Sequence, residues 1–191
     1  MEDAPMVEDA ATRWRTHDPR THGHPEDDHA ARDRLAREVP ARHNEVIVRG
    51  VTAAAVWHYL TDTSTWESYY DNVADISFPQ GGGPVLRDGL RFSFGTFGFP
   101  PLDAHVVEFQ APADGVPGRL SWTAKQDGTP EERLDVPHAW LVEDLPGGRV
   151  RVLTQETQIG RPAAEPARQT PKPMLNGHQA WLDGFVAAAS K

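Results

Sequence analysis

The C-terminal segment carries a single apolar stripe at helical spacing, and this feature limits the possible folds more than any other. Large side chains recur there at positions i, i+4, i+7 and i+11, which places them on one face of an α-helix. They are Met174, His178, Trp181 and Phe185, and Leu175, Leu182 and Val186 widen the face. The sequence therefore predicts a long helix over residues 174–189 that must bury one side.

Almost everything between residue 43 and this helix is typical of β-strands separated by turns. Alternating or β-branched segments are interrupted by Gly- and Pro-rich turn sequences. The expected strands cover residues 43–49, 73–78, 90–97, 102–109, 120–124, 136–142 and 149–158. Strands and helices do not alternate, so the pattern favours an antiparallel sheet.

Two short helices are expected between the first and second strands. Thr52 can cap the first, over residues 53–60. Ser64 can cap the second, over residues 64–70, with Glu67 completing a capping box. The predicted fold class is thus α+β, a curved antiparallel sheet of about seven strands wrapped around the long C-terminal helix. A sheet that curls around a single helix leaves space between the two.

The first 42 residues differ from the rest of the chain. They are dense in charged residues and contain His17, His22, His24 and His29, with little apolar periodicity. Such a segment buries too little to offset its ordering entropy, so it is interpreted as a flexible or partly helical tail. Its histidines can bind metal ions unspecifically, and no specific metal site is expected. Residues 43–191 form the predicted domain.

Composition excludes several classes of function. The chain of 191 residues has no cysteine, which rules out disulfides and thiolate metal sites. Its net charge of −9 disfavours nucleic-acid binding. No secretory signal and no membrane-spanning apolar run is present, so a cytoplasmic location is expected. No dinucleotide, phosphate-loop or hydrolase motif points to a cofactor, and none is expected.

A series of short segments follows the order of landmarks in a known fold. They are Ala55-Val-Trp57, Leu60-Thr-Asp62, Trp66, Asp88-Gly89, Val107-Glu108, Leu120-Ser-Trp122, Val152-Leu-Thr-Gln-Glu156, Gly160 and Ala180-Trp-Leu-Asp183. From about residue 43 onward the chain thereby resembles the START-like (SRPBCC) superfamily of helix-grip proteins, in particular its polyketide cyclase/dehydrase-type branch. The resemblance implies a cavity between sheet and helix for an apolar molecule such as a sterol, lipid or polyketide. Some members catalyse cyclisation or dehydration there.

Strand parity and the helical stripe select three candidate catalytic residues. His138 shares a strand face with Trp140, and Glu156 shares one with Thr154 on the next strand. A short Gly-Gly hairpin joins these strands, so the two faces should be neighbours. His178 lies in the helical stripe. We expect His138, Glu156 and His178 to converge on one cavity as acid–base groups. The alternative is that both histidines are structural and satisfied by hydrogen bonds.

Other residues are expected to contact a ligand. Tyr69 and Tyr70 can donate a hydroxyl, while Phe97 and Phe99 sit on a Gly- and Pro-rich loop that forms either a lid or a plug. The complete set is Tyr69, Tyr70, Phe92, Phe94, Phe97, Phe99, Trp122, Trp140, Thr154, Met174, Trp181 and Phe185. Related aromatase/cyclases use an inward Arg on the strand of Phe92, whereas Arg91 is expected in solvent here, which argues against transferring that site.

Two functions remain open from the sequence. In the first, the protein binds a hydrophobic, oxygenated molecule, polyketide- or lipid-like, either as a binding protein or as a cyclase/dehydratase-type biosynthetic enzyme with metal-free acid–base chemistry. In the second, it is a non-catalytic adaptor or carrier with a vestigial cavity that acts through protein–protein contacts. A large cavity favours the first function and a collapsed core the second. Either fits a monomer or a homodimer without nucleic acid or membrane insertion.

Overall fold

A computed structural model describes residues 41–191. The tail predicted over residues 1–42 therefore lies outside the described residues, except that the first strand already begins at Ala41. Within the described range, no helix is both long and apolar enough to cross a lipid bilayer.

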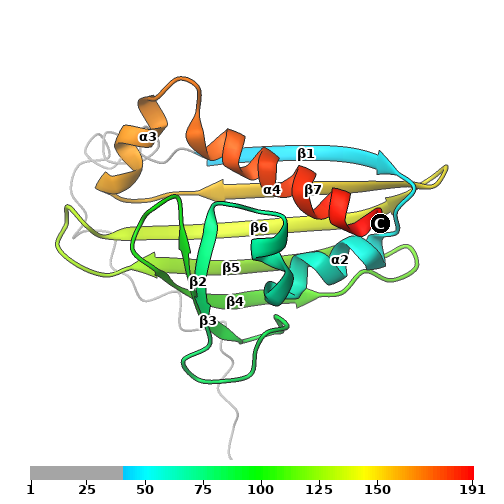
Figure 1. Cartoon of the computed structure of the whole chain (residues 1–191), viewed down its shortest axis with the longest axis horizontal. Coiled ribbons are helices and arrows are strands. Elements are labelled where there is room, and N and C mark those ends of the chain that lie inside the picture. The colour runs from blue at the N-terminus through cyan, green and yellow to red at the C-terminus, as the bar shows by residue number, and fades with distance from the viewer. Residues whose placement is uncertain (1–40) are drawn as a thin grey trace, which may run out of the picture. The chain divides into compact units, whose positions relative to one another are not determined.

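Seven strands form one antiparallel sheet (Figure 1). They are β1 (Ala41–Arg49), β2 (Val73–Ser77), β3 (Arg91–Thr96), β4 (Leu102–Gln110), β5 (Gly118–Gln126), β6 (Leu134–Leu145) and β7 (Arg149–Thr157). Their order across the sheet is β1-β7-β6-β5-β4-β3-β2. Apart from β1, each strand thus pairs with its neighbour in sequence, as expected of a meander. The strands β5 and β6 are longer than the sequence predicted. Their pairing continues to Gln126 and Leu134, into the segment that was expected to be a polar loop.

The helices are α2 (Ala53–Thr61), η3 (Thr63–Ser68), η4 (Arg161–Ala163), α3 (Ala164–Arg168) and α4 (Pro173–Ala189). Thr52 caps α2 as predicted, with its hydroxyl accepting from the Ala55 N–H at 3.1 Å. The predicted cap of the second short helix was wrong. η3 is a 3-10 helix, and Asp62 caps it by accepting from the Ser64 N–H at 3.1 Å. A capping side chain must stand just before the helix to reach its first free N–H groups. Asp62 does so and accepts from the N–H two residues on, whereas Ser64 already lies inside the 3-10 helix.

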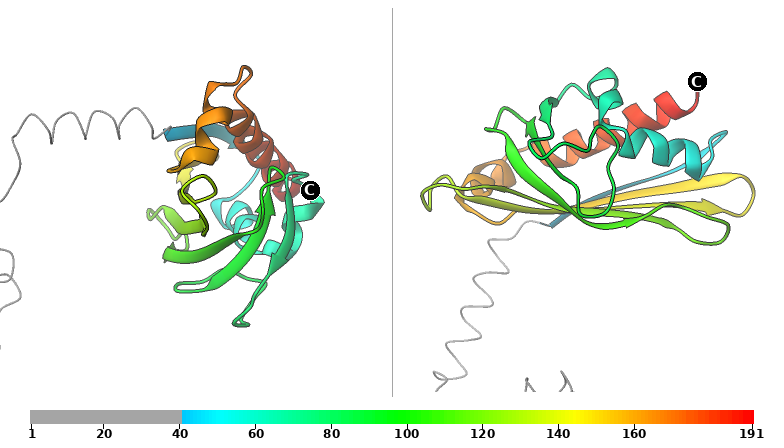
Figure 2. Two further views of the ribbon diagram at one scale, coloured as in Figure 1. Left: turned by 90° about the vertical axis from the view of Figure 1, so that its left-hand side faces the viewer. Right: turned by 90° about the horizontal axis from the view of Figure 1, so that it is seen from below.

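Helix α4 lies across the concave face of the sheet, on the same side as α2 (Figure 2). Trp181 and Phe185 on its inner face are buried. Asn44 on β1 ties the helix to the sheet edge, since its side-chain amide donates to the Leu175 carbonyl at 3.1 Å and to Gln179 Oε1 at 3.0 Å. The predicted α+β helix-grip arrangement is therefore confirmed.

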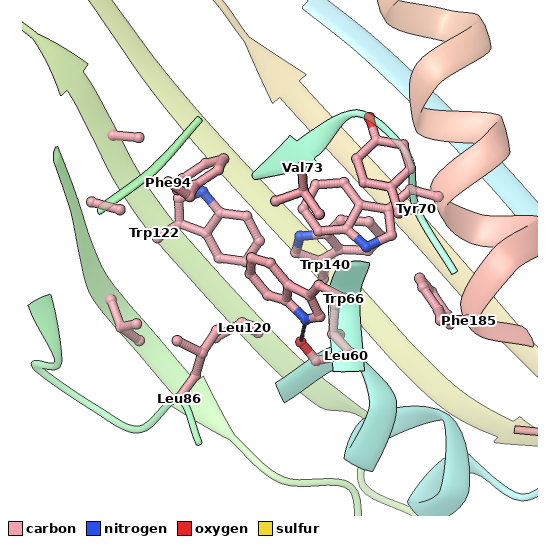
Figure 3. Close-up of a cluster of buried hydrophobic side chains, with 14 of the residues drawn as sticks. Leu60, Trp66, Tyr70, Val73, Leu86, Phe94, Leu120, Trp122, Trp140 and Phe185 are labelled. Carbon is pink, nitrogen blue, oxygen red and sulfur yellow. Dashed lines mark hydrogen bonds between the residues drawn. The ribbon is translucent and has the colours of Figure 1, made fainter. Parts of the chain in front are cut away.

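The space between sheet and α4 is filled by aromatic side chains towards the α2 side (Figure 3). We call this region the packed half and define it by Leu60, Trp66, Leu120, Trp140 and Phe185. Trp66 has no exposed surface, and its ring lies 5.1 Å from that of Trp181 between centroids. The Trp66 indole N–H donates to the Leu60 carbonyl at 3.1 Å, so its polar atom is satisfied. Nothing in this half is arranged for chemistry.

Candidate functional site

A pocket opens at the other end of the same space, beside the first turns of α4. It lies between the β3–β4 loop, the ends of β6 and β7, and α4. Its lining is Phe94, Thr96, Phe97, Phe99, Leu102, Trp122, Leu134, Val136, His138, Glu156, Gln158, Met174, His178 and Trp181. The free space is about 20 Å³, which is room for about one water molecule. We call this region the pocket half.

Three buried ionisable side chains meet in the pocket wall. His138 on β6 and Glu156 on β7 stand directly opposite each other in the antiparallel register. His138 Nδ1 lies 3.1 Å from Glu156 Oε2. His178 on α4 brings its Nε2 to 3.3 Å from the same oxygen. Two strands and a helix thus hold one carboxylate between two imidazoles, and we call these three residues the His–Glu–His cluster.

The outer atoms of the cluster are also held. Gln158 donates from Nε2 to Glu156 Oε1 at 2.8 Å, and the same amide lies 3.5 Å from the Met174 sulfur. His138 Nε2 pairs with the Thr154 hydroxyl at 2.7 Å. These contacts fix the carboxylate and one imidazole in a single orientation.

Proton positions follow from donor and acceptor chemistry. An ionised carboxylate only accepts, so His138 Nδ1 and His178 Nε2 both donate to Glu156. His138 Nε2 then accepts from the Thr154 hydroxyl. His178 Nδ1 is buried and has no hydrogen-bond partner among residues 41–191. His178 Nδ1 is thus the one imidazole nitrogen of the cluster without a hydrogen-bond partner among the described residues.

Burial and hydrogen bonding oppose each other at Glu156. Burial raises the pKa of this carboxyl, but the hydrogen bonds from His138 and His178 outweigh it and lower the pKa to about 2. At His138, burial lowers the pKa by more than the neighbouring carboxylate raises it. At neutral pH the cluster thus contains an ionised Glu156 beside a neutral His138. No described residue that lines the pocket is Lys or Arg.

Indole rings set the plane of His138. Its ring stacks on Trp140, with centroids 4.8 Å apart and an interplanar angle of 26°. Trp122 contacts the same imidazole at 4.8 Å and 59°, and the two indoles lie 6.2 Å apart. Trp122 also lines the pocket, whereas Trp140 stands behind the imidazole. The aromatic neighbours therefore position the histidine as much as they enclose a ligand.

The β3–β4 loop closes the mouth of the pocket with Phe97 and Phe99, both of which are half-buried. Phe97 has a φ of 52°, in the left-handed region that bulky residues rarely adopt. Its ring lies over Gly177 of α4, where a Cβ atom would overlap the far end of the ring. The Phe97 ring can therefore occupy this position only because residue 177 has no side chain.

The structure brings together most of the residues selected from the sequence. Those that line the pocket are Phe94, Phe97, Phe99, Trp122, His138, Glu156, Met174, His178 and Trp181. The remaining candidates lie outside its lining: Tyr69, Tyr70, Phe92, Trp140, Thr154 and Phe185. Arg91 is exposed while Phe92 and Phe94 are buried, as expected.

Neither tyrosine is part of the pocket lining, but the Tyr70 hydroxyl lies close to Gly177, beside the Phe97 ring. Tyr69 donates its hydroxyl to the Tyr59 carbonyl at 2.8 Å and packs against Phe185 in the packed half. Tyr70 stacks on Trp181 with centroids 4.6 Å apart, and its buried hydroxyl has no partner among the described residues. Burial raises the pKa of both phenols.

Sequence reasoning missed five lining residues: Thr96, Leu102, Leu134, Val136 and Gln158. A signal was present for two of them. Val136 lies two residues before His138, and Gln158 lies two residues after Glu156. In an extended strand, residues two apart point to the same face. Leu134 was missed because its strand was expected to start two residues later.

Fold and pocket define a helix-grip protein, and the comparisons agree. No protein-family model matches the sequence, and a search of curated proteins gives no match. The solved structure of hypothetical protein jhp0584 from Helicobacter pylori is similar, with 45% identity and a TM-score of 0.75 over 78% of this chain and 88% of that chain. The chain belongs to the same protein family as jhp0584.

Two further solved structures share the fold alone. A point mutant of norcoclaurine synthase from Thalictrum flavum, in complex with a transition-state analogue, has a TM-score of 0.55 and 11% identity, over 79% of this chain and 94% of that chain. The di-domain ARO/CYC StfQ of the steffimycin biosynthetic pathway has a TM-score of 0.62 and 12% identity, over 85% of this chain and 55% of that chain.

Proposed function

We propose that the protein binds a hydrophobic, oxygenated small molecule, polyketide- or lipid-like, in the pocket between the sheet and α4. The observation that carries this proposal is the His–Glu–His cluster, because it places three buried ionisable groups in the wall of a mainly aromatic and aliphatic pocket. A core that served stability alone would leave such groups out, since buried charge is costly. Apolar burial would supply affinity, and the cluster would orient the ligand's oxygen atoms.

The cluster also supports acid–base chemistry of the cyclase/dehydratase type. The unpartnered His178 Nδ1 is the atom suited to remove a proton from a bound molecule. The positive charge that develops on His178 would be stabilised by Glu156, 3.3 Å away at Nε2. His138 has no free nitrogen, so it acts by holding Glu156 in place. The polyketide cyclase/dehydrase branch of this fold is the class that we propose, and it includes steps of this kind.

A ligand larger than water requires the mouth of the pocket to open. The movable part is the β3–β4 loop, where Phe97 is held in a rarely adopted backbone conformation. Moving that loop exposes the lining without disturbing the sheet. We therefore assign Phe97 and Phe99 to a lid.

The test is native mass spectrometry of the full chain purified from its source organism, followed by binding of the fluorescent probe 1-anilinonaphthalene-8-sulfonate. We expect a co-purifying apolar molecule and saturable probe binding. His178→Ala should weaken binding of the identified molecule by about 1–2 kcal/mol, the scale of one hydrogen bond. If that molecule is a substrate, His178→Ala should lower turnover by about 10²–10⁴-fold and His138→Ala by less. His58→Ala, at an exposed histidine, is the control.

The small free volume supports a second candidate, an adaptor or carrier with a vestigial cavity that acts through protein contacts. It predicts no co-purifying molecule, no saturable probe binding, and a protein partner retained in crosslinked extracts. Saturable probe binding that is weakened by Trp122→Ala, a change in the pocket lining, would exclude it.

A further inference from the structure

We propose that the His–Glu–His cluster is also a binding site for one divalent transition-metal ion of the zinc class. His138 Nδ1, Glu156 Oε2 and His178 Nε2 would be its protein ligands. The sequence predicted no metal site, because the three residues are far apart in the chain and form no spaced motif. This inference does not depend on an organic ligand, so the two proposals can fail separately.

The separations between the candidate ligand atoms fit a shared ion. Ligands about 2.1 Å from a tetrahedral zinc ion lie about 3.4 Å from one another. Glu156 Oε2 is 3.1 Å from His138 Nδ1 and 3.3 Å from His178 Nε2. All three atoms lie within 4.8 Å of one another, so the two imidazoles need only close on the ion. Two imidazoles and one carboxylate are a common zinc ligand set.

Support behind the ligands is already in place. Metal-binding imidazoles commonly donate their second N–H to an oxygen atom. In the metal-bound form, His138 Nε2 would carry the proton and donate it to the Thr154 hydroxyl, which lies 2.7 Å away. Gln158 holds the other carboxylate oxygen at 2.8 Å. These contacts leave Oε2 as the oxygen that faces the two imidazoles.

One coordination position would face the pocket. The free space beside the cluster accommodates about one water molecule, as an open zinc site requires. The described lining has no Lys or Arg, so neither a lysine nor an arginine balances the buried Glu156 carboxylate. A divalent ion would supply that charge.

Metal binding and proton transfer would exclude each other at these atoms. A ligand nitrogen must be bare, so His138 would have to move its proton from Nδ1 to Nε2, and His178 its proton from Nε2 to Nδ1. The lone pair assigned to proton removal would then be lost. The metal would therefore switch the site from a proton acceptor to a Lewis-acid centre.

The experiment titrates Co²⁺, and then Zn²⁺ in competition, into chelator-treated full-length protein. His17, His22, His24 and His29 are replaced by Asn in every sample, which removes the tail histidines as competing ligands. We expect one Co²⁺ per chain, with the visible absorption of a four-coordinate ion. Glu156→Gln should weaken binding by more than about 100-fold and Gln158→Leu by about 10–100-fold, the scale of an outer partner. His58→Asn should change nothing.

A second measurement needs no change in the cluster. A long-range proton–nitrogen correlation spectrum should show the His178 proton moving from Nε2 to Nδ1 when Zn²⁺ is added. Equal Co²⁺ binding by wild type and Glu156→Gln, binding below one equivalent, or an unchanged His178 tautomer would each overturn the proposal. Should Glu156→Gln fail to unfold cooperatively, the Gln158→Leu titration and the spectrum decide. Probe binding in the same samples reports the proposed function independently.

Discussion

The packed half and the pocket half share the same sheet and the same helix but differ in what lies between them. In the packed half, Trp66 is fully enclosed and its N–H is satisfied by backbone. In the pocket half, a carboxylate and two imidazoles are enclosed, and His178 Nδ1 has no partner among the described residues. The comparison teaches that stability and chemistry are divided along α4, so each can be changed with limited effect on the other.

Two glycines on α4 show the same division at the level of single contacts. A Cβ at Gly184 would overlap the Tyr69 backbone carbonyl, whereas a Cβ at Gly177 would overlap the end of the Phe97 ring and lie 3.3 Å from the Tyr70 hydroxyl, both of them side-chain atoms. Backbone cannot move out of the way without shifting η3, but a ring on a loop can. Helix α4 is therefore packed against backbone that cannot yield in the packed half. In the pocket half it is packed against side chains that can move.

The largest effect is expected from Trp66→Ala in the packed half. Loss of a fully buried indole should lower the free energy of unfolding by about 3–5 kcal/mol. Urea denaturation monitored by circular dichroism measures it. Leu182→Ala, at a position that is also fully buried but holds a smaller aliphatic side chain, is a reference for cavity formation. A loss below about 1 kcal/mol would show that the packed half does not carry the stability.

Gly184→Ala should lower the free energy of unfolding by about 1–3 kcal/mol, the usual cost of adding a methyl group where the neighbouring backbone cannot move. The gain in helix propensity of about 1 kcal/mol is not enough to cancel this strain. Thermal unfolding of the variant beside Ala187→Gly, at an exposed position of the same helix, separates packing from propensity. An unchanged melting temperature in Gly184→Ala would mean that η3 is free to shift.

Acid should destabilise the protein through His138. The pKa of His138 is lowered from its ordinary value of 6.5 in the folded chain, so below pH 6.5 the unfolded chain binds a proton that the folded chain does not. The free energy of unfolding should therefore fall with decreasing pH, by up to about 1.4 kcal/mol per unit. Glu156 acts in the same direction, but only below its ordinary value of 4.5.

His138→Asn should flatten this slope between pH 6.5 and the range where Glu156 begins to titrate. Urea denaturation at a series of pH values gives the slope, and His58→Asn is the exposed control. An identical slope in His138→Asn and wild type would show that His138 is not neutral in the folded chain.

The smallest effect on stability is expected from Gly177→Ala. Displacement of the Phe97 ring and the gain in helix propensity oppose each other, so the free energy of unfolding should change by less than about 1 kcal/mol. The effect should appear in the lid instead, as faster association of an apolar probe measured by stopped-flow fluorescence. A slower association would place the moving part elsewhere.

The sequence predicted the architecture well because periodicity alone determines it. The α4 stripe and the alternation on β6 and β7 were sufficient to bring His138, Glu156 and His178 into one place. Two features were not predictable. The width of the cavity depends on side-chain packing at the β3–β4 loop, where the conformation of Phe97 is not encoded by any local propensity. The direction of Tyr69 depends on its bond to the Tyr59 carbonyl, a contact set by how η3 docks.

The direct opposition of His138 and Glu156 across β6 and β7 has a consequence for inheritance. A deletion or insertion in the hairpin loop leaves their pairing intact, whereas a slip of one residue in register turns one of them out of the pocket. Descendants of a common ancestor could therefore vary freely in loop length and in distance between these positions. Related proteins that keep this pocket would then share three short motifs in a fixed order but at variable spacing. The motifs are His-x-Trp, Thr-x-Glu-x-Gln and Gly-His-x-x-Trp.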